Sequence, residues 1–570
     1  MGMSTTKAIW TPESYGVELA EKTIGEMLDL RAQTHRDAPA LVFRAPETGV
    51  DRSWTYAQLK DDAVLYARAL IGLGVGKGDK VAVLSPNCPD WIILEYALAK
   101  IGAVLVTVNP AYRDTELRYL LENGDVHTLF YCSAFRGFSV AGMIASLVPE
   151  AAGTDAGQPL RAEAFPMLRR LVCMDGACRG ALGMSEFRAL ASATPASEVE
   201  KRQSQVAPHD PAQIQYTSGT TGAPKGVMLS HRGTLNNGIM TVARGGFSEK
   251  DRILSPMPLF HTAGCVCNVL GCIAAGAALI AMPAFDARRA LELMESEHAT
   301  ILNGAPTMFI RMMDVMDEDA KSGRTYDLSA FRLCWTGGTT ILPSLMEEVK
   351  RRMGADPMVI FGMTETSPLV TMTNPGDSFE LCAGTAGQPL AHTEIRIYDH
   401  DRKCVADIGQ QGELQIRGYL LMLGYYKMPE RTAETIVDGG WLRSGDLATL
   451  DATGYLRITG RLKDMIIRGG ENIYPAEVEN QLQQHPKIAQ AQLVAIPDRE
   501  MGEECCAFIE LKPGETSDAA EIAQWCRAHM ARHKLPKYIE FVDAFPLTPS
   551  GKIKKYELRE LAAQRIGVSA

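Results

Sequence analysis

The sequence predicts an α/β protein that combines a large N-terminal domain of parallel-rich sheets flanked by helices, a small distorted β-barrel, and a small α+β C-terminal domain. Three observations lead to this prediction. Apolar strands alternate with helices through the first two-thirds of the chain. Strands with a two-residue period appear from about Thr385, and a compact mixed segment follows Lys463. We expect the two domains to span 1–462 and 463–570.

The parallel sheets are predicted from a recurring strand–helix–strand order. KVAVLSP (80–86) has the composition of a short buried strand, 90–103 has helical spacing, and VLVTVNP (104–110) is a second strand. Because two strands joined by a helix usually run parallel, this order favours a parallel sheet. The same rhythm recurs around 253–258 and 299–306.

The later part of the chain has a different pattern. EIRIYD (394–399) and GELQIRG (412–418) alternate like half-buried strands and predict a small antiparallel sheet or barrel. The tail contains a helix that begins at Pro475, a strand near 506–511 and an amphipathic helix over about 519–532. These elements predict a separate domain of about a hundred residues.

Charge and cysteine usage exclude several classes of protein. The 570 residues carry a formal net charge of −10, so nothing in the composition attracts nucleic acid or an anionic membrane. The 13 cysteines contain no CxxC pair, which is not typical of a zinc site or a disulfide framework. The N-terminus lacks the apolar core of a secretory signal. We therefore expect a cytoplasmic protein with reduced thiols.

One segment is long and apolar enough to be tested as a membrane span. Residues 263–282 contain Asn268 as their only polar side chain. They are rich in Gly, Ala and Cys, however, and no Lys/Arg cluster flanks them. We interpret the segment as a buried helix and expect no stable membrane insertion.

TSGTTGAPKG (217–226) indicates a phosphate-binding loop. Glycines let backbone N–H groups approach phosphate, hydroxyls donate hydrogen bonds, and Lys225 adds a positive charge. The residues before the lysine that would contact phosphate are Thr217, Ser218, Gly219, Thr220, Thr221 and Gly222. Pro224 and Gly226 flank the lysine and a strand-like segment follows it, so the loop is not a Walker motif. The alternative, a flexible surface turn, is disfavoured by seven Gly, Ser or Thr residues in ten.

Six further motifs follow this loop in order. They are PLFHTAG (258–264), WTGGTT (335–340), FGMTET (361–366), RSGD (443–446), GRLKD (460–464) and PSGKIKK (549–555). Together with the loop they resemble the signature of the adenylate-forming superfamily, and the whole sequence resembles bacterial fatty-acyl-CoA synthetases. The resemblance covers nearly the entire chain.

The resemblance implies ATP-dependent activation of a carboxylic acid with Mg²⁺. The acid and the nucleotide are both anions, so they must be neutralised and held in line for attack on the α-phosphorus. By resemblance, Lys225 holds the departing phosphates, Thr364 contacts the α-phosphate and Glu365 binds Mg²⁺. Lys552 would bridge the acid and the α-phosphate as charge builds up.

The resemblance also implies further nucleotide contacts. Asp446 would accept hydrogen bonds from the ribose hydroxyls, and Arg461 would assist it. The other candidates for binding the nucleotide are Gly338, Thr339, Phe361 and Gly362. Taken singly, the charged residues would be interpreted as surface charges.

A second half-reaction, attack of a thiol on the acyl-adenylate, implies a mobile C-terminal domain. In the family this domain rotates about a hinge residue, which here falls on Lys463, where many relatives carry Asp. Gly469 and Gly470 would then let the pantetheine arm of coenzyme A pass close to the backbone. A Gly-Gly turn next to a strand is the structural alternative.

The acid pocket is expected beside the 263–268 segment. Its candidate residues are Ala263, Gly264, Cys267, Thr340 and Met363. His261 would lie beside the bound acid, unless it is a core histidine, and we assign it no proton transfer. Small side chains imply a deep apolar pocket. No Lys or Arg stands out to pair with a second carboxylate of the substrate, and no Asp is placed to receive an amino group. These features favour a medium-chain fatty acid or an aryl-alkyl acid.

The expected acceptor is free coenzyme A, because no carrier-protein domain follows Ala570. Transfer to a separate carrier protein and a non-catalytic nucleotide-binding homologue are the alternatives. A membrane-inserted transporter would depend on 263–282. The expected partners are therefore a small carboxylic acid, ATP and coenzyme A, with a homodimer possible.

Overall fold

The computed structural model describes residues 6–14, 16–45, 49–217, 224–337, 343–469, 471–498, 500–547 and 553–566, without the side chains of Glu471 and Asn472. The chain forms two compact units. The large unit consists of Thr11–Glu394 and Arg417–Gly440, and the small unit of Met1–Trp10, Ile395–Ile416 and Trp441–Ala570. The predicted domain division at Lys463 stays a prediction.

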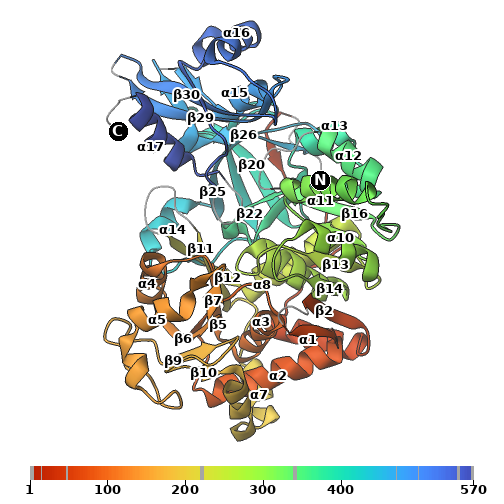
Figure 1. Cartoon of the computed structure of the whole chain (residues 1–570), viewed down its shortest axis with the longest axis vertical. Coiled ribbons are helices and arrows are strands. Elements are labelled where there is room, and N and C mark those ends of the chain that lie inside the picture. The colour runs from red at the N-terminus through yellow and green to blue at the C-terminus, as the bar shows by residue number, and fades with distance from the viewer. Residues whose placement is uncertain are drawn as a thin grey trace. The chain divides into compact units, whose positions relative to one another are not determined.

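The first sheet of the large unit confirms the predicted parallel arrangement. Its described strands, in spatial order, are β10 (Leu182–Gly183), β9 (Arg170–Cys173), β6 (Val126–Tyr131), β4 (Lys80–Leu84), β5 (Val104–Val108), β11 (Pro211–Thr217), β12 (Lys225–Ser230) and β23 (Gly424–Tyr425). The pairs from β10 to β11 are parallel, whereas β12 is antiparallel to both of its neighbours. Buried side chains of α4 (Asp114–Asn123) and α5 (Val140–Leu147), the two helices coloured orange in Figure 1, pack against this sheet.

The second sheet of the large unit is also parallel in its middle. Its described strands, in spatial order, are β19 (Gln388–Pro389), β18 (Leu369–Met372), β17 (Asp356–Gly362), β16 (Leu333–Gly337), β15 (Ile301–Asn303), β13 (Arg252–Ser255), β14 (Ala278–Ala281), β2 (Pro39–Ala45) and β3 (Val50–Thr55). The helices α10 (Ala287–Ser296), α11 (Pro306–Ala320) and α12 (Pro343–Met353) contribute buried residues to the cluster beside it. The other helices of 4 residues or more in the large unit are α1 (Ile24–Thr34), α2 (Tyr56–Gly72), α3 (Pro89–Ile101), η2 (Pro149–Gly153), α6 (Met184–Ala189), η3 (Leu190–Ala193), α7 (Ala196–Gln203), α8 (His231–Gly245), η4 (Ala263–Leu270), α9 (Gly271–Ala275), α13 (Phe379–Gly384) and α14 (Pro429–Thr435).

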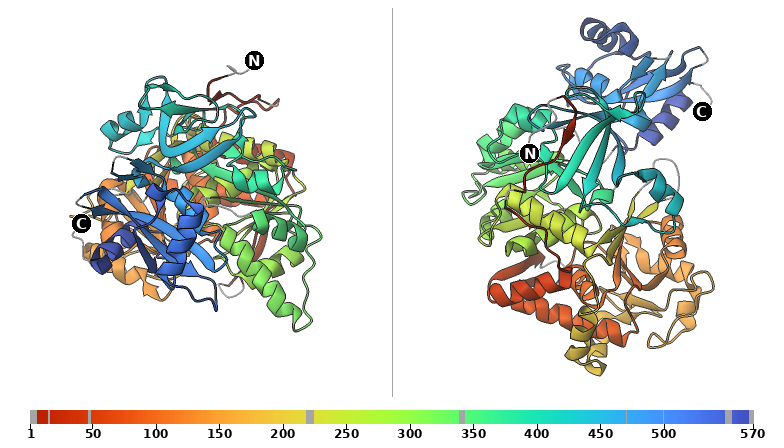
Figure 2. Two further views of the ribbon diagram at one scale, coloured as in Figure 1. Left: turned by 90° about the horizontal axis from the view of Figure 1, so that it is seen from above. Right: turned by 180° about the vertical axis from the view of Figure 1, so that it is seen from behind.

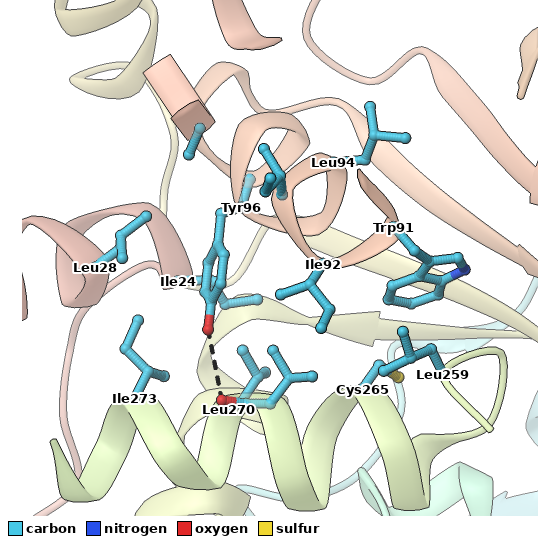
Figure 3. Packing of buried hydrophobic residues seen from close by; sticks show 14 of the residues in the cluster. Ile24, Leu28, Trp91, Ile92, Leu94, Tyr96, Leu259, Cys265, Leu270 and Ile273 are labelled. Carbon is cyan, nitrogen blue, oxygen red and sulfur yellow. Dashed lines mark hydrogen bonds between the residues drawn. The ribbon is translucent and has the colours of Figure 1, made fainter. Parts of the chain in front are cut away.

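Helix α3 lies in the centre of the largest hydrophobic cluster. It begins with Pro89 in its first turn and ends at Gly102, which adopts a left-handed conformation at φ 68°. Every residue from Trp91 to Ile101 is buried, including the polar Glu95 and Lys100. Tyr96 of α3 donates a hydrogen bond to the Val269 carbonyl of η4 at 3.5 Å, and Figure 3 draws this bond as a dashed line from the Tyr96 hydroxyl. The segment in which we expect the acid pocket therefore packs directly against this helix.

The prediction of one buried helix over 263–282 was wrong in extent. The segment forms the π-helical η4, then α9, and then enters β14. Gly276 ends the helix because it adopts φ 76°, which favours glycine. Within the described parts of the chain, no helix is both long enough and apolar enough to span a membrane.

In the small unit, the predicted antiparallel strands form a sheet whose path runs β1 (Ile9–Trp10), β20 (Thr393–Asp399), β22 (Gly412–Gly418) and β25 (Trp441–Leu450), with β21 (Cys404–Val405) beside β20 and β26 (Leu456–Arg461) beside β25. The tail contains β27 (Ile466–Arg468), β28 (Glu471–Ile473), β29 (Ile488–Asp498), β30 (Gly502–Leu511) and β31 (Tyr538–Phe541). Its helices are η6 (Leu462–Asp464), α15 (Pro475–Leu482), α16 (Ala519–His529), η7 (Arg532–Lys534) and α17 (Lys555–Ile566). Buried residues of α15 and α16 pack on one face of the sheet in the tail, and those of α17 pack on its other face. Figure 2 shows the tail in blue.

Candidate active site

The predicted phosphate loop connects two antiparallel strands. Thr217, the last residue of β11, pairs with Lys225, the first residue of β12. The strand predicted after the lysine is therefore confirmed, and the loop does not lead into a helix. Ser218, Gly219, Thr220, Thr221 and Gly222 lie outside the described residues. The pairing of Thr217 with Lys225 nevertheless fixes the position at which the loop leaves the sheet.

Lys225 is linked to Glu365 through Tyr425, a residue that sequence reasoning missed. The Lys225 ammonium lies 4.3 Å from the centre of the Tyr425 ring and donates to the Tyr425 hydroxyl at 3.2 Å. That hydroxyl donates to Glu365 Oε1 at 2.9 Å. Burial and the nearby carboxylate raise the pKa of Tyr425 well above its ordinary value, so the hydroxyl keeps its proton. A carboxylate can only accept and an ammonium can only donate, which fixes the direction of both hydrogen bonds.

Glu365 stands in a short turn after β17. The turn η5 (Thr364–Thr366) leaves the Glu365 side chain buried, with 8% of the residue exposed. Buried Thr366 donates its hydroxyl to the Pro368 carbonyl at 2.6 Å and thereby closes the turn. A Cβ at Gly362 would overlap the same carbonyl, so this position requires glycine. Phe361, Met363 and Thr364 occupy the surrounding positions of the strand end and turn.

The π-helical η4 carries three of the predicted acid-pocket residues, Ala263, Gly264 and Cys267, and His261 precedes it. His261 and Ala263 are partly exposed, whereas Gly264 and Cys267 are buried. The His261 Nδ1 accepts a hydrogen bond from the Ala263 N–H at 3.1 Å. Burial raises the pKa of the Cys267 thiol to about 12, so this thiol is not a nucleophile at neutral pH. Gly264 cannot carry a side chain, because a Cβ there would overlap the Pro258 carbonyl.

Asn268, the one polar side chain of this segment, anchors η4 to the second sheet. Its amide donates to Ser255 Oγ at 2.6 Å, and its carbonyl accepts from Asn303 Nδ2 at 3.0 Å. Ser255 and Asn303 end the neighbouring strands β13 and β15. The polar residue is therefore structural, and its bonds fix the position of the pocket segment on the sheet.

In the small unit the structure brings Asp446 and Arg461 together across β25 and β26. The Arg461 Nε lies 3.1 Å from Asp446 Oδ1. Lys463 follows in η6, where burial and the charge of Arg461 lower its pKa to about 8. Gly469 adopts φ 59°, and a Cβ there would crowd the end of the Met501 side chain. Gly470 and Lys552, like Gly338, Thr339 and Thr340 of the large unit, lie outside the described residues.

These features, namely the hairpin with its lysine, the carboxylate linked to it through one tyrosine, and the paired aspartate, agree with the adenylate-forming class of enzyme that the sequence motifs resemble. Two family models match the chain: AMP-binding enzyme over residues 28–426 and AMP-binding enzyme C-terminal domain over residues 477–552. The chain belongs to the acyl-CoA synthetase family of AMP-binding enzymes.

Similar proteins cover nearly the whole chain. YngI of Bacillus subtilis strain 168, which carries the name of an acyl-CoA synthetase, is 41% identical over 97% of this chain and 99% of its own length. The medium-chain acyl-CoA ligase ACSF2, mitochondrial, of Macaca fascicularis is 37% identical over 95% of this chain and 87% of its own length.

Solved structures confirm the predicted fold class. The anthranilate CoA ligase AuaEII in complex with anthranoyl-AMP has a TM-score of 0.82 and 27% identity, covering 98% of this chain and 100% of that chain. The Mycobacterium tuberculosis fatty acyl CoA synthetase has a TM-score of 0.72 and 30% identity, covering 95% and 99%. The predicted enzyme class, an AMP-forming acid–thiol ligase, is thereby confirmed.

Proposed function

We propose that the chain first joins a carboxylic acid to ATP, forming an acyl-adenylate and pyrophosphate, and then transfers the acyl group to coenzyme A with release of AMP. The observation that carries this proposal is the chain of contacts from Lys225 through Tyr425 to Glu365. It places a cation and a carboxylate side by side where the phosphate loop leaves the sheet, and transfer at phosphorus needs both.

Each residue has a distinct part in the first step. Lys225 and the loop hold the phosphates that depart as pyrophosphate, and Thr364 contacts the α-phosphate. Mg²⁺, when bound, neutralises phosphate charge. The buried Glu365 carboxylate fits that ion, because its Oε1 accepts from a neutral tyrosine hydroxyl and not from a competing cation. Asp446 accepts hydrogen bonds from the ribose hydroxyls, and Lys552 stabilises charge between the acid and the α-phosphate.

The second step uses other residues of the same chain. We propose that the C-terminal domain turns about Lys463 between the two steps, so that Lys552 serves adenylation and the Gly469–Gly470 turn serves the thiol. The left-handed Gly469 supports this assignment, because a larger residue would crowd Met501.

The substrate we propose is a medium-chain fatty acid or an aryl-alkyl acid. The small residues of η4 and the medium-chain ligase among the relatives support this choice. Among the solved structures, a fatty acyl CoA synthetase and an anthranilate CoA ligase support the aliphatic and the aromatic alternative, respectively. His261 and Ala263 line the pocket entrance in this proposal. All 13 cysteines are free thiols, which suits the reducing compartment that we expect.

A panel of straight-chain and aryl-alkyl acids with ATP and Mg²⁺ tests the proposal. Pyrophosphate release is measured with and without coenzyme A, and acyl-AMP and acyl-CoA are identified by mass spectrometry. We expect release that depends on the acid, and acyl-CoA only when coenzyme A is present. Pyrophosphate release in the absence of an acid would contradict the proposed function. So would the absence of release with all of the acids in the panel. Acyl-AMP that never passes to coenzyme A would favour a carrier protein as acceptor.

A further inference from the structure

Tyr425 joins three elements of the large unit that are far apart in the sequence. It lies in β23, which pairs with β12 of the phosphate hairpin, and the neighbouring Met422 N–H donates to the Glu365 carbonyl at 2.9 Å. The Tyr425 N–H donates to Thr432 Oγ1 at 2.9 Å, which ties the strand to α14. The backbone of this strand is therefore anchored on both sides, and Tyr425 is buried, with 4% of the residue exposed.

The ring and the hydroxyl of Tyr425 have different surroundings. The ring belongs to a small apolar cluster with Val227, Leu229 and Met422. The hydroxyl instead lies between the Lys225 ammonium and the Glu365 carboxylate. An apolar residue of similar shape would satisfy the cluster equally well, so packing does not account for the hydroxyl.

A lysine and a glutamate that bond to the same hydroxyl could instead have formed an ion pair with each other. Among the described residues, the bonding partner that Lys225 and Glu365 share is the Tyr425 hydroxyl, and they form no direct ion pair. The aromatic face offers the ammonium a second attraction that leaves its other donors available. The Lys225 ammonium and the Glu365 carboxylate thus lie on the same hydroxyl without forming an ion pair with each other.

We propose that Tyr425 is a positioning residue of the adenylation site. Its hydroxyl separates the Lys225 ammonium from the Glu365 carboxylate and orients both, so that the lysine meets the outgoing phosphates and the carboxylate meets the divalent cation. This inference rests on the proposed function for the roles of Lys225 and Glu365. Tyr425 itself does not touch the reacting atoms in this proposal.

Two tyrosines in sequence provide the test and its control. Tyr425→Phe removes one hydroxyl and keeps the ring. Tyr426→Phe removes the neighbouring hydroxyl, which donates to the carboxylate of Asp125 at 2.7 Å. Calorimetry measures the binding of α,β-methylene-ATP with Mg²⁺, and separately of AMP without Mg²⁺, to the full-length protein.

Tyr425→Phe should weaken binding of the magnesium triphosphate by about tenfold, the size expected for a lost hydrogen bond to a charged group. AMP affinity should not change, because AMP lacks the outgoing phosphates, and Tyr426→Phe should match the wild type with both ligands. Unchanged triphosphate binding, or an equal loss for AMP, would overturn the proposal. Pyrophosphate release by the wild type tests the proposed function separately, so the two failures are distinguishable.

Discussion

The Arg461 guanidinium lies 3.1 Å from the Asp446 carboxylate, directly across the pairing of β25 and β26. Asp446 is buried, with 7% of the residue exposed, whereas the Arg461 side chain remains about half exposed. The arginine thus supplies positive charge from the solvent side and leaves the carboxylate able to accept further hydrogen bonds.

If Asp446 binds the ribose as we propose, Asp446→Asn should lower kcat/KM for ATP by about 10- to 100-fold, because the amide loses the negative charge and replaces one acceptor oxygen with a donor. Thermal stability should change little, since ion pairs with an exposed partner contribute about 1 kcal/mol or less. Steady-state kinetics and thermal unfolding measure the two effects. Asp407→Asn, which removes the exposed ion pair with Lys7, is the control, and an equal kinetic loss there would contradict the ribose assignment.

Lys552→Ala should strongly suppress adenylate formation and leave the conversion of supplied acyl-adenylate to thioester much less affected. The reason is that only the first step builds charge between the acid and the α-phosphate. Single-turnover assays of each half-reaction measure this difference. Lys554→Ala is the matched control, because Lys554 pairs with Glu557 on the protein surface. Equal loss of both half-reactions would argue against two positions of the C-terminal domain.

Gly362→Ala should destabilise the large unit by about 1–3 kcal/mol, because the new methyl group would overlap the Pro368 carbonyl. The displaced turn carries Thr364 and Glu365, so the affinity for Mg²⁺·ATP should fall as well. Urea unfolding and calorimetry measure both quantities. Gly176→Ala, where a Cβ meets open space, should leave both unchanged. A fully stable Gly362→Ala protein would show that the turn adapts.

His231 should make the protein sensitive to mild acid. Burial lowers the pKa of this histidine to about 4 from an ordinary value of 6.5. Below 6.5 the unfolded chain takes up a proton that the folded chain refuses, so stability falls with pH until about 4, below which this loss is complete. From pH 7 to 5 the loss from this one group is about 2 kcal/mol.

His231→Asn tests this pH dependence, because an amide oxygen can replace Nδ1 as the acceptor for the Ile24 N–H. Urea unfolding of both proteins is measured at pH 7 and pH 5. The variant should lose about 2 kcal/mol less than the wild type over this interval. Parallel losses in both proteins would assign the acid sensitivity to other groups.

Local patterns in the sequence predicted much of the fold, whereas the roles of the site residues stay predictions. The strand–helix–strand order over 80–110 and the strand after Lys225 depend on neighbouring residues, and both are confirmed. The end of η4 and α9 was missed, because one glycine in an apolar run does not reveal its left-handed conformation. Tyr425 was missed because its contacts come from residues 60 and 200 positions away, and only strand pairing brings them together.

Helix α3 is buried on every side, and η4 packs against it. Amides within such a helix exchange with solvent only when the surrounding unit unfolds. The backbone beneath the proposed acid pocket should therefore be the slowest part of the large unit to exchange deuterium. We therefore expect the proposed pocket to resist widening around a longer acid. The preferred length of the acid should then depend on the volumes of individual side chains. We expect substitutions of these side chains to change that preference more than movements of the backbone do.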